Sequence, residues 1–224
     1  MQRAKQVSES IELGIILALV GGFMDVYSYV GRDGVFANAQ TGNILLVGVH
    51  LSEGDPSLAM RYLLPVLCFS VGIMVSDLVH ERFASVMHWR QLTVLAEAVI
   101  LLGVGLLSSE YNMLANGLTS LACGMQVESF RKVNATPLPP LCAPETCAAA
   151  RSGCTYGGRP ASGTTDTGRQ YYGIIVFFIV GAALGAWCSG RWGQRAVLGA
   201  CVLLLAAFLL MFQRKPLAGT GKGV

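Results

Sequence analysis

Long apolar stretches alternate with short polar ones along most of the chain. A helix needs about 20 mostly apolar residues to cross the hydrocarbon core of a bilayer. Six stretches approach that length: residues 11–30, 59–79, 91–107, 113–130, 171–190 and 194–212. The pattern predicts an all-α fold, a polytopic membrane helix bundle with about six full transmembrane helices.

A shorter apolar run, residues 41–51, lies between the first two long stretches in GRDGVFANAQTGNILLVGVHLSEGD. As a helix it would extend roughly 16 Å, about half of the bilayer core. We therefore expect a re-entrant half-helix. Thr41 or Asn43 can cap its first turn, and Gly42 lets another group approach the backbone closely. The alternative is an ordinary outer loop with an amphipathic segment.

The two halves of the chain resemble each other. LCFSVGIMVSDLVHER and VFFIVGAALGAWCSGR align without a gap, which pairs Gly72 with Gly181. The first helix of each half has polar and small residues on one face, namely Gly22, Asp25 and Ser28 in one and Gly117, Ser120, Gly124 and Glu128 in the other. Because each half has three crossings, residues 11–108 and 111–212 are expected to form inverted repeats. Such repeats are typical of secondary transporters, whose sites lie near the midplane.

Composition narrows the class of protein. The chain is 53% hydrophobic and 13% charged, whereas soluble domains carry about 25% charged residues. Basic residues form no patch with interleaved aromatics, so nucleic acid is not expected as a partner. Cys142, Cys147 and Cys154 fit no zinc spacing, and we expect no metal and no cofactor.

Lys and Arg resist translocation when they lie close to helix ends. If the N-terminus is inside, twelve of the 16 Lys and Arg residues fall in inner segments and four in outer ones. The four outer ones are Arg32, Arg61, Arg191 and Arg195. This distribution predicts that residues 1–10 and the tail 213–224 are both cytoplasmic.

Three segments carry a family resemblance. GGFMDVYSYVGRDGVFANAQTGN, RYLLPVLCFSVG and GMQVESFRKVN resemble the YoaK-type family of uncharacterised bacterial multipass membrane proteins, over nearly the whole chain. The resemblance implies the bacterial plasma (inner) membrane and no known substrate. Members of that family carry a second TGN after the GMQ helix, and this chain has none there.

In place of the second TGN lies an aberrant segment, residues 137–165, rich in Pro, Cys, Gly and Ala. One permitted codon choice for residues 141–151 encodes MCTGNLRSGTE in the neighbouring frame, which would restore the motif. We infer two compensating frame slips. We also expect the segment to be disordered, because it contains too little apolar surface to offset its ordering entropy. The alternative is a natural flexible loop.

Ionisable groups inside membrane spans are functional candidates because they are costly there. The proton-coupling candidates are Asp25, Glu97 and Glu128, although Asp25 and Glu97 could equally bond polar groups on neighbouring helices. Asp77 lies near the end of its span and is expected to face water or pair with Arg82. The predicted substrate-binding residues are Asp25, Asn38, Gln40, Thr41, Gly42, Asn43 and Gln126.

These residues suggest a secondary transporter of a small solute. An anionic or carbonyl group would lie at the N-terminus of the half-helix, whose amides and dipole favour it, while Asp25 or Glu97 carries the coupling proton. The alternative is a non-catalytic structural or regulatory membrane protein that shows no saturable flux. An enzyme is not expected, because the chain has no GxSxG, no HExxH and no acid pair suited to proteolysis. The bilayer and an unknown solute are the expected partners, and a homo-oligomer is compatible with the pattern.

Overall fold

The computed structural model describes residues 11–83, 89–130, 132–133, 136–137 and 164–213. The helices are α1 (Ile11–Gly31), α2 (Gln40–Ser52), α3 (Pro56–Phe83), α4 (Trp89–Leu106), α5 (Asn112–Ser129), α7 (Thr164–Trp192) and α8 (Leu198–Gln213). Two 3-10 turns, η2 (Ser109–Tyr111) and η3 (Gly193–Val197), precede α5 and α8. A two-residue antiparallel pair, β1 (Lys132–Val133) with β2 (Thr136–Pro137), follows α5. All other secondary structure of the described chain is helical, which confirms the predicted all-α class.

Most of the segment predicted to be frame-shifted, residues 138–163, lies outside the described residues. Its two edges are described: Pro137 belongs to β2, and residues 164–165 already belong to α7. Both terminal segments that were predicted to be cytoplasmic, 1–10 and 214–224, also lie outside the described part.

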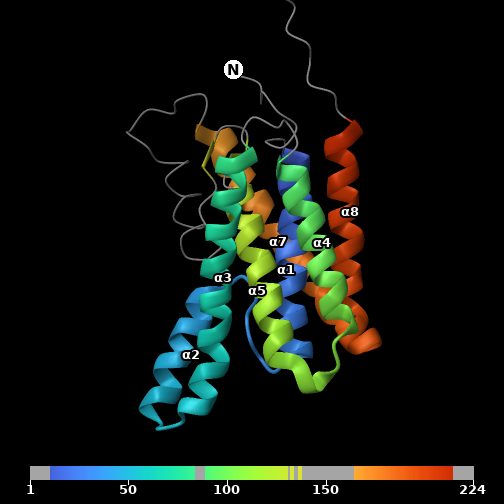
Figure 1. Ribbon diagram of the computed structural model, residues 1–224. Helices are drawn as coiled ribbons and strands as arrows, with labels where there is room; N and C mark the ends of the chain where they lie inside the picture. Colours follow the sequence, from blue (N-terminus) through green and yellow to red (C-terminus); the bar gives the residue numbers. More distant parts are fainter. Residues whose placement is uncertain (1–10, 84–88, 131, 134–135, 138–163, 214–224) are drawn as a thin grey trace, which may run out of the picture.

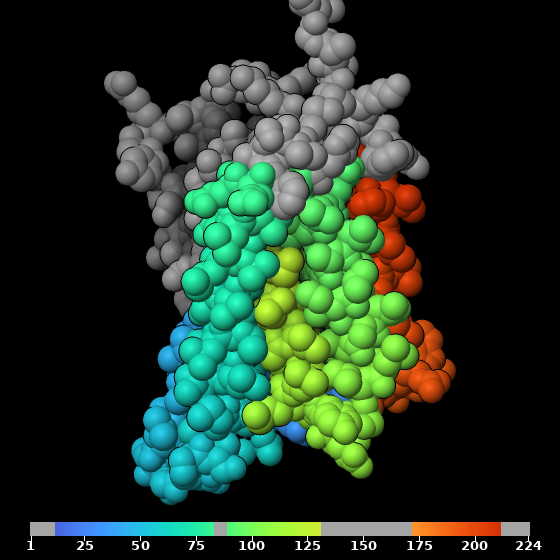
Figure 2. Space-filling model, viewed as in Figure 1, coloured from blue at the N-terminus to red at the C-terminus, as the bar shows by residue number. Residues whose placement is uncertain are grey.

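The long helices run along a common direction, and α2 lies beside one end of α3 (Figure 1). Figure 2 shows α5 in the seam between α3 and α4, on one face of the bundle. Helix α1 packs along α7, α5 along α3, and α4 against α8. These six long helices occupy the six stretches predicted to span the bilayer.

Four stretches of the described chain are long and apolar enough to cross a membrane: Glu12–Gly31, Pro56–Arg82, Trp89–Leu106 and Tyr172–Met211. The last one joins α7 and α8 through η3. Helix α5 is not among these four stretches. It carries polar residues such as Asn112, Asn116 and Gln126, and twelve of its 18 residues, these included, are buried. Leu67, Met74 and Val176 are among many large apolar side chains that stay exposed, as a lipid-facing surface requires. The structure is therefore compatible with a membrane protein.

Two helix pairs are in backbone contact at glycines. At each of four positions a Cβ atom would collide with a carbonyl oxygen of the facing helix, so no other residue fits without moving the helices apart. The contacts are Gly22 against Phe178 and Gly181 against Leu19 in the α1–α7 pair, and Gly124 against Phe69 and Gly72 against Leu121 in the α3–α5 pair.

We expect Gly22→Ala to destabilise the bundle by about 1–3 kcal/mol, because the added methyl group forces α1 away from α7. The matched control is Gly103→Ala in α4, where a Cβ would meet nothing within 4 Å. That change should be neutral or stabilising, by up to about 1 kcal/mol, since Ala favours helix. Thermal unfolding of the detergent-solubilised variants measures the difference. Equal melting temperatures for the two variants would show that the α1–α7 contact is looser than described.

Helix α2 corresponds to the predicted half-helix but begins at Gln40 and ends at Ser52. Its 13 residues extend about 20 Å, which is too short to cross a bilayer core. The backbone amide of Asn38, just before α2, donates to the Oδ1 atom of Asp25 at 2.6 Å. Asp25 lies six residues before the end of α1, or about 9 Å along its axis. The chain therefore turns back along α1 before α2 starts.

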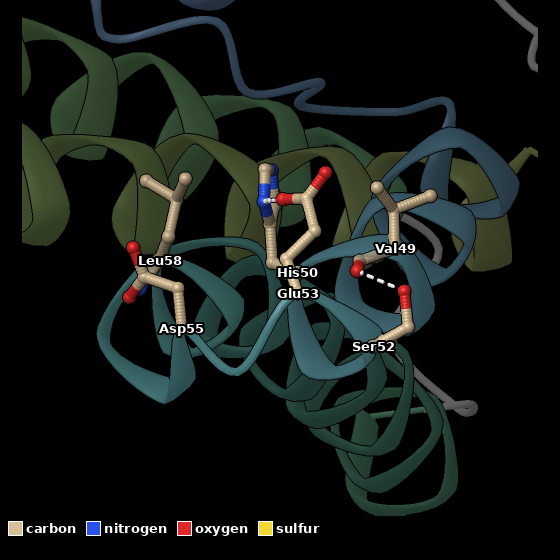
Figure 3. A network of polar contacts seen from close by, with 6 residues as sticks. All are labelled: Val49, His50, Ser52, Glu53, Asp55 and Leu58. Carbon is tan, nitrogen blue, oxygen red and sulfur yellow. Dashed lines mark hydrogen bonds and ion pairs between the residues drawn. The ribbon is translucent and has the colours of Figure 1, made fainter.

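The turn from α2 into α3 is held by short polar contacts (Figure 3). His50 Nδ1 lies 2.9 Å from Glu53 Oε2, and Ser52 Oγ donates to the carbonyl of Val49 at 2.7 Å. The backbone amide of Leu58 donates to Asp55 Oδ1 at 2.9 Å, so Asp55 caps the first turn of α3. The two helices thereby form a stable hairpin.

Candidate functional site

Polar side chains are buried in the middle of the bundle, on α1, on α4, on α5 and in the segment before α2. Burial of a polar group without a hydrogen bond costs free energy. We therefore describe the hydrogen bonds of each buried group, because a group whose bonds are all made within the protein has a structural role. The buried residues that bear on the predicted site are Asp25, Ser28, Asn38, Gln40, Asn43, Glu97, Asn116, Ser120 and Gln126.

Asp25 anchors the start of α2. Its side chain is 5% exposed, and Oδ1 accepts hydrogen bonds from the backbone amides of Asn38 at 2.6 Å and Ala39 at 3.2 Å. Ala39 is the N-cap residue of α2 and makes no side-chain cap of its own. The acid on α1 therefore supplies the negative group that the N-terminus of α2 attracts. In the first turn of α2 itself, the backbone amides of Gln40 and Gly42 donate to the carbonyls of Asn38 and Ala39 at 2.8 and 3.0 Å.

We expect Asp25→Ala to destabilise the protein by about 1–3 kcal/mol, because two buried amides lose their acceptor. Asp25→Asn keeps an oxygen at the same position and should cost much less. Thermal unfolding in detergent compares the two variants. If Asn were as damaging as Ala, the negative charge and not the acceptor would be what α2 requires.

The polar residues of the FANAQTGN segment bond to one another. Asn43 Nδ2 donates to the carbonyl of Phe36 at 2.7 Å and to Gln40 Oε1 at 2.9 Å, and Asn43 Oδ1 accepts from the amide of Phe36 at 3.0 Å. Gln40 Nε2 donates to the carbonyl of Ala37 at 2.7 Å. These side chains shape the loop that leads into α2.

Capping by Thr41 or Asn43 was a wrong prediction. The helix begins at Gln40, one residue before Thr41, and Ala39 is its N-cap residue. Thr41 is exposed. A Cβ at Gly42 would lie 2.9 Å from the Phe36 ring, so the group that approaches the backbone at this glycine is an aromatic ring of the same loop.

Glu97 is the buried acid of the described interior that lacks hydrogen-bond partners. It lies in the middle of α4, is fully buried, and neither carboxyl oxygen has a hydrogen-bond partner among the described residues. Cys123 on α5 is within electrostatic reach of both Glu97 and Asp25, and Cys201 on α8 is within reach of Glu97. The two acids thus lie in the same central region. Burial of an ionised carboxylate without a partner costs several kcal/mol, of order 3–5, so the neutral acid fits this site.

Several other buried polar atoms also lack partners within the described part of the chain. They are the Oγ atoms of Ser28 and Ser120, Asn116 Oδ1 and Gln126 Nε2. Asn116 and Ser120 lie on one face of α5 by the i, i+4 spacing. Buried polar atoms in folded proteins are nearly always paired with protein or water. The interior therefore has unused hydrogen-bonding capacity for water or a small solute.

The other predicted acids lie at the ends of their helices. Glu128 is half-buried in the last turn of α5, two residues before Phe130. Asp77 on α3 is exposed, and its expected contact with water or with Arg82 stays a prediction. Neither belongs to the central group of Asp25, Glu97 and Cys123.

Arg32 is the buried residue whose role the sequence did not reveal. It was counted as an outer-loop residue, yet it is fully buried. Its Nε donates to Tyr27 Oη at 2.9 Å, and Nη1 donates to Asn112 Oδ1 at 3.0 Å. The remaining donors bond three carbonyls at the end of α4, those of Val104, Leu107 and Ser108.

The Arg32 guanidinium has no free donor, because all five of its N–H groups are used. It lies at the negative end of the α4 dipole, which stabilises a cation there. Asn116 Nδ2 donates to the Arg32 carbonyl at 2.6 Å, and Tyr27 Oη donates to the carbonyl of Gln194 in η3 at 3.0 Å. This Arg32 cluster joins one end of α1, α4, α5 and η3. The pattern Arg-Asp-Gly after an apolar run indicates only a turn, so no sequence signal distinguished it.

A family model described as "Protein of unknown function (DUF1275)" matches residues 13–210. The chain belongs to the DUF1275 family. The matched range includes every site residue described above and all the helices, apart from the first two residues of α1 and the last three of α8. No curated protein and no solved structure matches this DUF1275 chain. Its chemistry therefore has to be argued from the interior geometry, in which Arg32 uses all of its donors, Asp25 Oδ1 accepts two backbone amides, and Glu97 has no described hydrogen-bond partner.

Proposed function

We propose that this DUF1275 protein is a secondary transporter of a small solute, and that Glu97 carries the coupling proton. The observation that carries the proposal is the fully buried Glu97 carboxyl group, without a described hydrogen-bond partner in the middle of α4. Intramembrane acids of this kind are typical of proton relays in transporters. The YoaK-type resemblance and the charge distribution favour the bacterial plasma membrane with both termini in the cytoplasm.

Two inverted repeats, α1–α3–α4 and α5–α7–α8, are part of this proposal. Gly22 and Gly124, like Leu19 and Leu121, are 102 positions apart, whereas Gly72 and Gly181, like Phe69 and Phe178, are 109 apart. The two glycine contacts of the α1–α7 pair therefore recur, residue for residue, in the α3–α5 pair. In both pairs, the first helix of one repeat packs against the middle helix of the other repeat. Inverted repeats that are joined in this way support an alternating-access carrier with its site between the two halves.

The buried charges favour a cationic or neutral solute. Asp25 and Glu97 both contribute carboxyl groups to the centre, and Arg32, the buried cation of the described interior, has no donor left for an anion. A solute with hydrogen-bond donors would complement the unused acceptors Asn116 Oδ1 and Glu97. The sequence instead suggested an anionic or carbonyl group at the N-terminus of the half-helix, where the amides of Gln40 and Gly42 donate to the carbonyls of Asn38 and Ala39.

A panel of small solutes tests the proposed function by thermal unfolding of the detergent-solubilised protein. The panel contains amines, amino acids, sugars and carboxylates. A solute at 100 times its Kd stabilises the folded state by about 2.7 kcal/mol, so we expect saturable stabilisation by at least one cationic or neutral member. The alternative is a non-catalytic structural or regulatory protein, and the internal hydrogen bonds of the FANAQTGN loop fit that role as well. It predicts that no solute of the panel stabilises the protein.

The second half-helix is tested at the level of DNA. We expect sequencing of the codons for residues 135–166 to show single-base slips at both edges of the aberrant segment. The corrected chain would then carry TGN in each repeat, and the present chain would serve as a control with one site removed. If the present frame stands, a mechanism with two paired half-helices must be abandoned, and α2 alone must suffice.

A further inference from the structure

A groove lies at the turn between α7 and α8, on the outside of the bundle. It has a volume of about 610 Å³ and is lined by Trp192, Arg195, Leu198, Gly199, Val202 and Leu203. Trp192 is 57% exposed and Val202 is 66% exposed. Arg195 contributes the one charge among these otherwise apolar residues. A groove of this size, within the range of about 300–1,000 Å³ of small-molecule sites, suits an apolar chain with a polar end.

Two positive charges lie on the segment that forms the groove. Arg191 and Arg195 are both exposed, and no Asp or Glu follows Asp166 in the chain. The Arg191 guanidinium lies over the Trp187 ring at 5.3 Å, and the Trp187 and Trp192 rings meet edge to face at 5.9 Å. Trp is enriched at the boundary between bilayer and water, and Arg side chains near the ends of membrane helices reach toward that boundary.

The groove extends from this boundary toward the bilayer core. Its charged end is next to η3, which Tyr27 bonds to the Arg32 cluster at the end of α1. Its apolar end follows α8, where Leu198 and Val202 share one helical face. A molecule that fills both ends needs a negative head group and a hydrocarbon tail.

We propose that this groove binds one anionic phospholipid, with its phosphate between Arg191 and Arg195 and an acyl chain over Leu198 and Val202. Neutral phospholipids can fill the apolar part, but they carry no net negative charge to match the two guanidinium groups. This site is separate from the interior around Glu97, so it does not depend on transport activity.

Native mass spectrometry of the detergent-purified protein, titrated with phosphatidylglycerol or with phosphatidylcholine of the same acyl chains, tests the proposal. We expect at least fivefold tighter binding of the first phosphatidylglycerol molecule, and loss of that preference in the double variant Arg191→Gln, Arg195→Gln. The control is Arg82→Gln, an exposed arginine in the last turn of α3, which should keep it.

A second variant, Val202→Trp, fills the apolar part of the groove from an exposed position and should weaken the binding of both lipids. Thermal unfolding without lipid identifies any variant that is misfolded. Equal affinity of the wild-type protein for the two lipids would overturn the proposal. So would an unchanged preference in the folded double variant, since the negative lipid would then bind elsewhere.

Discussion

Replacing Glu97 by Gln should abolish proton coupling while the protein stays folded. Gln has nearly the same shape, carries no titratable proton and is neutral, as the unpartnered site requires. In proteoliposomes, uptake driven by a pH gradient should fall to background, whereas exchange of labelled for unlabelled solute should persist, because exchange requires no net proton transfer. The solute is the one identified by thermal stabilisation.

The matched control for Glu97→Gln is Asp77→Asn, which neutralises an exposed acid on α3 and should leave coupling unchanged. Asp25→Asn is expected to retain coupling as well, since Asp25 is bonded to the amides before α2. Full coupling in Glu97→Gln together with its loss in Asp25→Asn would transfer the proton-carrying role to Asp25.

Replacing Arg32 by Met should destabilise the protein by about 3–5 kcal/mol, the range typical of breaking a buried polar network. Five hydrogen bonds are lost, and the carbonyls at the end of α4 remain buried without their donor. Because proteins are stable by only about 5–15 kcal/mol, we expect a large fall in melting temperature and in yield.

Arg32→Lys should recover only part of this stability, because an ammonium group has three donors and lacks the planar fork of Arg. The control is Arg82→Met, at an exposed arginine, which should shift the melting temperature little. An Arg32→Met variant as stable as Arg82→Met would show that the Arg32 cluster does not hold the four elements together.

Much of the fold was predictable, because the length of each apolar stretch and the spacing of its glycines can be read from a single short segment of the sequence. The six long helices and α2 lie where the apolar stretches predicted them, since a run of about 20 apolar residues has few alternatives in a bilayer. The alignment of Gly72 with Gly181 identified the glycines that form backbone contacts. The exact partners, α1 with α7 and α3 with α5, were not predicted.

The candidate site was only partly predictable, because hydrogen bonds between distant residues decide the roles. Asp25 and Glu97 looked alike in the sequence, as single acids within apolar helices. Asp25 is anchored by amides that follow it by 13 and 14 positions, whereas Glu97 has no described partner. Arg32 bonds carbonyls more than 70 positions away. Neither arrangement leaves a pattern within a local sequence window.

The most direct measurement is proton movement in proteoliposomes that contain the purified protein. The protein used has the sequence of residues 138–163 that the DNA encodes. A pH-sensitive dye inside the vesicles reports proton flux when each solute of the panel is added outside. We predict that at least one cationic or neutral solute drives saturable proton movement, and that Glu97→Gln eliminates it. No solute-dependent proton movement, combined with no thermal stabilisation by any solute, would contradict the account and leave the structural or regulatory role.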